Sequence, residues 1–151
     1  MNSDLRDLYQ EVVIDHSRRP RNFRKMERPD RAVEGFNPLC GDKLVLYVKL
    51  NDRLIEDISF EGSGCAISKA SASMMTAAVK GKSKAEAQEL FQQFHTLITE
   101  GPAGPVKREQ LGKLAALGGV SEFPARVKCA SLAWHTLRAA LEGRNEAIST
   151  E

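Results

Sequence analysis

The sequence predicts an α+β fold in which a small sheet is covered by helices. Apolar and polar residues alternate over residues 43–50, and a second alternating run follows the turn Asn51–Arg53. From Cys65 onward the apolar spacing becomes helical in several separate stretches, the last of which reaches Leu141. The 151 residues are 42% hydrophobic, which suits a single domain with its own core. Two strands alone are marginal in water, so a third strand and a helical cover are expected.

An amphipathic helix is predicted at the beginning of the chain, where apolar residues recur at helical spacing up to His16. Its apolar stripe consists of Leu5, Leu8, Tyr9, Val12 and Val13. The next segment, Ser17–Asp30, contains two prolines and six basic residues, which is typical of a loop or an extended basic arm. Residues 32–36 then supply the candidate for the third strand.

The two central strands share one pattern, with every second side chain apolar. In the first strand these residues are Leu44, Leu46, Val48 and Leu50. In the second strand the buried face is predicted to consist of Leu54, Ile58 and Phe60. Gly62-Ser63-Gly64 then ends the strand.

Three further helices are predicted. The first begins at Cys65 and ends at Gly81. Ser83 and Glu86 match a capping box, and the helix after them carries the stripe Leu90, Phe91, Phe94, Leu97 and Ile98. Pro124 suits the first turn of the last helix, because its missing N–H costs nothing there. Gly143 ends that helix, and the tail from Asn145 is expected to fray.

The whole chain, residues 1–151, is predicted to be one domain that carries a surface insertion near residues 101–119. This stretch contains five of the glycines and two of the prolines, with a short helical patch at Leu111, Leu114 and Leu117. Glycine and proline interrupt regular elements, so a loop on the surface is the expected structure.

Charge and cysteine content exclude several classes of function. The formal net charge of +2 does not indicate a nucleic-acid binder, although six arginines and lysines lie in the basic arm. No apolar run is long enough for a signal peptide or a membrane span, so a cytosolic (cytoplasmic) protein is expected. The three cysteines cannot all pair internally, which in a reducing compartment favours free thiols, metal ligands or reactive groups.

Each cysteine is placed at the boundary of an element. Cys40 lies in a turn just before a strand, Cys65 begins a helix, and Cys129 lies in the first turns of the last helix. Helix N-termini stabilise negative charge and so favour thiolate, the form that binds metal and attacks sulfur. Cys40, between Pro38 and Gly41, is the cysteine that could move at lowest cost.

A tetrahedral zinc site needs a fourth ligand besides the three thiolates, and Asp42 is the natural candidate. It follows Cys40 by two residues, so both side chains can point to the same side of the strand entrance. Protonated Lys128 has no lone pair to donate, and His16, His95 and His135 are poorly placed in the pattern. Arg126 and Lys128 are expected to offset the site's negative charge. The plainer alternative is three ordinary free cysteines.

These residues also resemble a known family, the IscU/SufU/NifU-N proteins of iron–sulfur cluster assembly. The likeness rests on Asn37-Pro38-Leu39-Cys40-Gly41-Asp42, on Gly62-Ser63-Gly64-Cys65-Ala66-Ile67-Ser68 and on Arg126-Val127-Lys128-Cys129-Ala130. It also includes Ala70–Met75, and near the beginning Leu8-Tyr9-Gln10-Glu11, Asp15-His16 and Pro20-Arg21-Asn22, so it covers nearly the whole chain. It implies a three-stranded antiparallel sheet with helices packed on one side.

Two features are similar to the SufU branch. Scaffold IscU proteins have histidine where this chain has Lys128, and they lack the stretch near 101–119. The resemblance therefore implies a protein that holds one Zn²⁺ per chain and transfers sulfur as the second substrate of a SufS-type cysteine desulfurase. It implies that the desulfurase's persulfide sulfur passes to Cys40, once Cys40 has been displaced from zinc, and then to a downstream acceptor or Suf scaffold.

Two alternatives stay open on the sequence. One is a scaffold that assembles a [2Fe–2S] cluster on the same ligands, because thiolates suit iron and zinc alike. The other is a structural zinc module for contact with protein or nucleic acid, for which the basic arm is the best support. A run of charge is usually solvated surface, so no nucleic-acid partner is expected.

Overall fold

The computed structural model describes residues 3–101, 111–143 and 147–149. The chain begins with helix α1, Ser3–Arg18, and continues through strands β1, Arg31–Asn37, β2, Asp42–Asn51, and β3, Leu54–Ser63. The elements that follow are α2 (Ala66–Val79), α3 (Lys84–Glu100), the 3₁₀ helix η1 (Gly112–Glu122), α5 (Pro124–Leu141) and β4 (Ile148–Ser149). The strand predicted near residues 32–36 is therefore present.

The described residues form a sheet of four strands rather than the predicted three, in the order β3-β2-β1-β4. The β1–β2 and β2–β3 pairs are antiparallel, as expected, whereas β4 pairs with β1 in parallel through Gly35 and Phe36. The prediction of a frayed tail is thus wrong at Ile148 and Ser149. Two residues carry too little periodicity to be recognised in a sequence.

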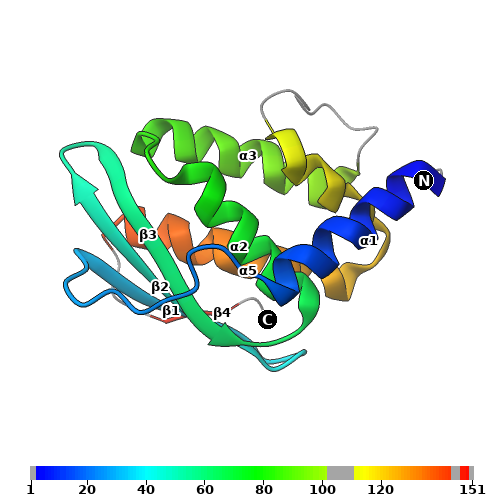
Figure 1. The fold of residues 1–151 in the computed structure, drawn as a ribbon, viewed down its shortest axis with the longest axis horizontal. Helices are drawn as coiled ribbons and strands as arrows, with labels where there is room; N and C mark the ends of the chain where they lie inside the picture. The colour runs from blue at the N-terminus through cyan, green and yellow to red at the C-terminus, as the bar shows by residue number, and fades with distance from the viewer. Residues whose placement is uncertain (1–2, 102–110, 144–146, 150–151) are drawn as a thin grey trace.

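The helices cover one face of this sheet, as predicted (Figure 1). Helix α5 packs on β1 and β2, and α2 packs on β3. Helices α1, α3 and η1 lie farther out and contact α2 and α5. Across the described part of the chain, the helices are too short or too polar to cross a bilayer.

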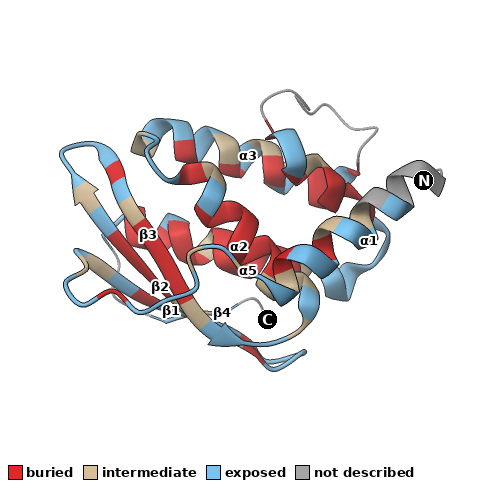
Figure 2. Cartoon of the chain, viewed as in Figure 1, coloured by how far each residue is buried: buried red, intermediate tan, exposed pale blue. Residues whose placement is uncertain are grey.

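The core lies between the sheet and these helices, where Figure 2 shows the buried residues of α2, α5 and the strands facing one another. Trp134 of α5 stacks on Phe94 of α3, with ring centroids 4.6 Å apart, and its Nε1 donates to Ser71 Oγ at 3.2 Å. His16 is buried too, with Nδ1 2.7 Å from Ser73 Oγ. Both residues pack in the interior.

The inner face of β3 differs from the prediction at its beginning. Ile58 and Phe60 are buried as expected, but Leu54 is exposed and Ile55 is fully buried instead. The pairing with β2 shifts between Lys49 and Leu50, which is a β-bulge. The extra residue reverses the alternation on one side of the bulge, and a period-2 pattern cannot reveal it.

The stretch expected as a surface insertion is partly core. Residues 102–110 lie outside the described residues, but Leu111, Leu114, Leu117 and Val120 are buried in the main hydrophobic cluster. η1, which holds the last three of these, packs against α3 and α5. Apolar residues three apart in the sequence share one face of a 3₁₀ helix, and here that face is buried. The glycine-rich composition predicted a loop and did not indicate this buried face.

The basic arm runs along the outer edge of β3. Arg24 N donates to Phe60 O and Phe60 N donates to Asn22 O, both at 3.0 Å, and Arg24 forms a 2.7 Å ion pair with Asp57. An unpaired edge strand invites pairing with another chain. The arm therefore serves partly to cover this edge, in addition to presenting charge to solvent.

Candidate metal site

Four predicted ligands come from three segments that meet at one end of the sheet. Cys40 lies in the exposed loop between β1 and β2, and Asp42 is the first residue of β2. Cys65 is the N-cap of α2, and Cys129 lies in the second turn of α5. All three cysteines are free thiols. The hairpin turn, the α2 entrance and α5 together build the cluster.

The side-chain atoms of this cluster are close together. The Cys129 and Cys40 sulfurs are 3.3 Å apart, and the ligand atoms of Cys40, Asp42 and Cys129 all lie within 4.8 Å of one another. Cys65 Sγ lies 3.9 Å from Asp42 Oδ2. The ligand atoms of Cys40, Asp42 and Cys129 therefore form one close group, and Cys65 lies beside Asp42.

This spacing suits a tetrahedral zinc ion. With Zn–S bonds of about 2.3 Å, two ligand sulfurs of a tetrahedron are about 3.8 Å apart, and a sulfur and an oxygen slightly less. The 3.3 Å and 3.9 Å separations need only small adjustments to match. Thiolate sulfur also suits iron, so the donor set by itself does not choose between these metals.

Asp42 is fully buried and is held from the backbone. Its Oδ1 accepts the Cys65 N–H at 2.7 Å. A Cβ on Gly64 would collide with this carboxylate, so the glycine before Cys65 is what lets the α2 entrance approach Asp42 so closely. The Gly62-Ser63-Gly64 stretch therefore lets the beginning of α2 lie against Asp42, in addition to ending β3.

The Cys65 sulfur caps its own helix. Its Sγ accepts the N–H of Ser68 at 3.4 Å, in the place where serine or aspartate usually caps an α-helix. The exposed backbone N–H groups and the helix dipole favour negative charge on this sulfur. The predicted placement of Cys65 at a helix N-terminus is therefore present.

Cys129 behaves differently from the expectation for a thiol near a helix N-terminus. It is only 3% exposed, and burial raises the pKa of its thiol well above the ordinary range. Hydrogen bonding with Cys40 and Asp42, and the charge of Cys65, raise it further. Desolvation therefore outweighs the helix dipole here, and a nearby cation would favour the Cys129 thiolate.

Arg126 lies near the site without joining the ligands. Burial raises the pKa of Tyr9, the charges of Cys65 and Cys129 raise it as well, and the charge and hydrogen bonding of Arg126 oppose them. The guanidinium also stacks over Phe123, 4.3 Å from the ring centre. Tyr9 thus lies within the electrostatic influence of Arg126 and of both thiols. Lys128, which precedes Cys129 in the chain, is half-buried.

Sequence reasoning missed Asn37, which is fully buried and touches two of the candidate ligands. Its Nδ2 is 3.2 Å from Asp42 Oδ2 and 3.5 Å from Cys129 Sγ. The signal was its place in the hairpin, because Asn37 and Asp42 are cross-strand partners. Facing residues of an antiparallel pair lie side by side.

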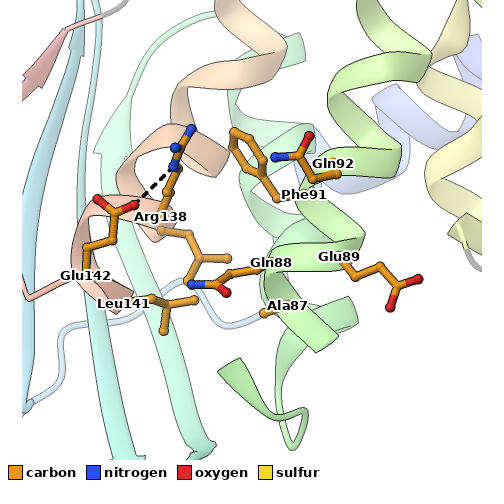
Figure 3. A pocket seen from close by; sticks show the side chains of 9 residues that line it. Ala87, Gln88, Glu89, Phe91, Gln92, Arg138, Leu141 and Glu142 are labelled. Carbon is orange, nitrogen blue, oxygen red and sulfur yellow. Dashed lines mark hydrogen bonds and ion pairs between the residues drawn. The ribbon is translucent and has the colours of Figure 1, made fainter. Parts of the chain in front are cut away.

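A cavity of about 360 Å³ lies elsewhere, between α3 and α5 (Figure 3). Phe91 and Leu137 line it, and the Arg138–Glu142 ion pair borders it. Arg138 is nine residues beyond Cys129 on α5, about 13 Å along the helix axis at 1.5 Å per residue. His95 and His135 lie on the same two helices, with ring centroids 6.0 Å apart. The candidate ligands are thus separate from this cavity.

Comparison with known proteins places the chain in a family. The model of the NifU-like N-terminal domain matches residues 8–142. The iron–sulfur cluster assembly scaffold protein IscU of Streptococcus pyogenes is 46% identical over 93% of this chain and 86% of its own length. The zinc-dependent sulfurtransferase SufU of Bacillus subtilis is 43% identical over 90% of each.

Solved structures agree with the fold. A hypothetical protein that is 45% identical superposes with a TM-score of 0.83, covering 90% of this chain and 98% of the other. A candidate iron–sulfur cluster assembly scaffold protein for the SUF system of Fervidobacterium islandicum is 35% identical, with a TM-score of 0.83 over 89% and 97% of the two chains. The chain therefore belongs to the NifU-like N-terminal domain family, the IscU/SufU family of iron–sulfur cluster assembly proteins.

Proposed function

We propose that this protein is a zinc-dependent sulfur-transfer protein that accepts persulfide sulfur on Cys40 from a SufS-type cysteine desulfurase. The observation that carries the proposal is the unequal fixing of the four candidate ligands. Asp42 and Cys129 are buried, and Cys65 caps a helix, whereas Cys40 lies on an exposed loop. One ligand can therefore leave while the other three stay in place.

The site supports zinc as its resident ion. Cys40, Asp42, Cys65 and Cys129 would hold one Zn²⁺ per chain, with Arg126 and Lys128 offsetting the negative charge of the ligands. When bound, zinc would keep the ligand thiols deprotonated near neutral pH. Cys129 would depend most on this effect of zinc, because burial raises the pKa of its thiol.

The transfer step needs only the Cys40 thiolate and the partner's persulfide. The Cys40 sulfur attacks the outer sulfur of the persulfide and forms a new S–S bond. The partner's S–S bond breaks, and its electron pair leaves on the partner's cysteine as thiolate. No net oxidation occurs in this step. Two equivalents of a thiol reductant then reduce the Cys40 persulfide to the thiol and become a disulfide, and the outer sulfur leaves as sulfide for a downstream acceptor or Suf scaffold.

The exposed surface around Cys40 is compatible with the approach of a protein partner. Leu39, next to the acceptor, is 64% exposed, and Phe123 is 45% exposed beside Arg126. A sulfur carried on another protein's cysteine can reach Cys40 only if the loop is open to that protein. Loop placement of a reactive residue on a rigid scaffold is a common arrangement.

The second candidate function is a scaffold for a [2Fe–2S] cluster on the same ligands. The name of the Streptococcus pyogenes relative favours it, and so does the preference of iron for thiolate. Lys128 argues for transfer instead, because scaffold members of the family carry a histidine at this position. A lysine ammonium has no lone pair, so it adds no nitrogen ligand beside Cys129.

The test compares wild type with Lys128→His and with Lys128→Arg, which keeps the cation. Each is assayed with cysteine, desulfurase and reductant for stimulated turnover, and in parallel by anaerobic reconstitution with iron and sulfide. We expect wild type and Lys128→Arg to stimulate turnover, and Lys128→His to stimulate less and to move toward cluster assembly. A stable cluster on wild type without stimulation would replace transfer by scaffolding. Zinc binding with neither activity would indicate a structural zinc module.

A further inference from the structure

Asn37 occupies a special place in the hairpin that carries two of the candidate ligands. It is the last residue of β1 and pairs directly with Asp42, the first residue of β2. The four residues between them form the loop that holds Cys40. Asn37 is fully buried, and a buried asparagine is uncommon unless its amide has a defined task.

The Asn37 amide links the sheet to helix α5 through two candidate ligands. One contact runs from Nδ2 to Asp42 Oδ2 at 3.2 Å, and the other to Cys129 Sγ at 3.5 Å. An amide nitrogen has two hydrogens, so it can serve both acceptors at once. Asp42 and Cys129 are 87 positions apart in the chain, and this side chain bridges them.

The orientation of the amide is set by the site. A flipped amide would turn Oδ1 toward the Asp42 carboxylate, where two oxygens would repel each other. In the observed orientation Oδ1 is buried without a hydrogen-bond partner among the described residues. Buried polar atoms are rarely left unpaired. The side chain thus gives up one hydrogen bond while both of its N–H groups face candidate ligands.

We propose that Asn37 is a positioning residue that fixes Asp42 and Cys129 at the separation one metal ion requires. This inference rests on the metal site of the proposed function. Ligand carboxylates and their neighbours are commonly held by such outer hydrogen bonds, whose loss weakens metal binding by about 10- to 100-fold.

The two oxygens of Asp42 are then held from opposite sides. Oδ1 accepts the Cys65 N–H and Oδ2 accepts the Asn37 amide, so the carboxylate cannot rotate freely. Cys129 is held by the same amide. Cys40 Sγ accepts from Cys129 Sγ at 3.3 Å, and no contact among the described residues joins it to the Asn37 amide. Asn37 therefore helps to keep Asp42 and Cys129 still while Cys40 can exchange.

The experiment replaces Asn37 by leucine, which has a similar branched shape but no donor, and by serine, which is smaller and avoids added bulk. Ser59→Ala is the matched control, because Ser59 is also fully buried in the sheet and its Oγ has no partner among the described residues. Three readouts are measured for each: zinc affinity by competition with a chromogenic chelator, the absorption spectrum of the Co²⁺-loaded protein, and the melting temperature of the metal-free protein.

We expect Asn37→Leu and Asn37→Ser to weaken zinc binding by about 10- to 100-fold and to change the Co²⁺ bands. Ser59→Ala should leave affinity and bands unchanged, and the metal-free melting temperatures should stay close to wild type. Zinc affinity within about threefold of wild type, with identical Co²⁺ spectra, would overturn the role; the margin is well below the loss expected for such contacts. So would a loss of affinity that merely follows a loss of metal-free stability.

The same data separate this inference from the proposed function. If wild type binds zinc but receives no sulfur from the desulfurase, the sulfur-transfer function fails, and the affinity comparison still decides the role of Asn37. If wild type binds no zinc at all, the metal site and the role of Asn37 fall together.

Discussion

At the scale of single residues, burial and the position on a loop or a regular element decide what each candidate ligand can do. Cys129 and Asp42 are buried, and the surrounding donors hold Asp42 at both oxygens. Cys40 is exposed on a four-residue loop. Chemistry alone would make the three cysteines equivalent, and it is their environments that separate two fixed thiols from one that can move.

Gly64→Ala is predicted to damage the metal site specifically. The new Cβ would collide with the Asp42 carboxylate and push either Asp42 or the α2 entrance away. Gly81→Ala is the control, since Gly81 also has a positive φ but no atom lies within 4 Å of its would-be Cβ. Backbone strain should cost the control about 1 kcal/mol of unfolding free energy.

Chelator competition and urea unfolding of both variants distinguish the two effects. Only Gly64→Ala should lower zinc affinity, by about tenfold or more, the size of effect seen when groups around metal ligands are disturbed. Equal zinc affinities for Gly64→Ala and Gly81→Ala would show that the close approach of Gly64 to Asp42 is unimportant for binding.

At the scale of elements, α5 is positioned by polar contacts inside the helical layer. Ser71 of α2 donates to Ala130 O at 2.6 Å and accepts the Trp134 indole N–H at 3.2 Å. Ala130 follows Cys129 directly, so these bonds help to set the height of the thiol above the sheet. A buried donor that loses its acceptor costs about 1–3 kcal/mol.

Ser71→Ala is therefore predicted to lower the unfolding free energy by about 1–3 kcal/mol, because the Trp134 N–H is left unpaired. Ser131→Ala is the matched control, since Ser131 is also buried but its hydroxyl bonds only a carbonyl of its own helix, Lys128 O. Urea unfolding of the two variants provides the measurement. A change within 0.5 kcal/mol for both, the ordinary range of a neutral substitution, would contradict this reading of Ser71.

Most of the elements follow from the sequence for physical reasons. The capping box at Ser83 and Glu86 was recognisable because it pairs backbone N–H groups within a local pattern. Pro124 in the first turn of α5 was recognisable because it lacks the N–H that this turn would leave unpaired. The bulge near Leu50, the short strand at Ile148 and the buried face of η1 were not. They depend on strand register and on contacts between elements, which local periodicity does not report.

The residues of the candidate site also divide into those that the sequence predicts and those that it does not. The cysteines at element boundaries and Asp42 two residues after Cys40 could be selected from spacing and residue chemistry. Asn37 could not, because its role depends on the register of the β1–β2 hairpin and on α5 lying over it. The raised pKa of Cys129 also required its burial to be known.

At the scale of the whole molecule, a bound zinc ion would tie together segments that are far apart in the chain. Its candidate ligands lie in the β1–β2 loop, at the start of β2, at the entrance of α2 and in the second turn of α5. Because these segments meet at one end of the sheet, part of the metal's binding energy is folding energy; structural zinc sites contribute about 10–16 kcal/mol of apparent binding free energy.

Removal of zinc with a chelator is thus predicted to lower the melting temperature sharply, and Cys65→Ala should do the same. Differential scanning calorimetry with and without chelator, together with metal analysis of freshly purified protein, checks both. We expect about one zinc per chain. Protein that purifies without zinc and melts at the same temperature with and without chelator would contradict the metal site.

The most direct test of the central claim is to locate the transferred sulfur. Wild type, Cys40→Ala and Cys65→Ala are each incubated with a SufS-type desulfurase and cysteine without reductant, the remaining thiols are alkylated, and peptides are analysed by mass spectrometry. We predict one additional sulfur on Cys40 of wild type, and none on Cys40→Ala although that variant keeps part of its zinc. An additional sulfur on Cys65 or Cys129 of wild type, or full sulfur loading of Cys40→Ala, would contradict the account.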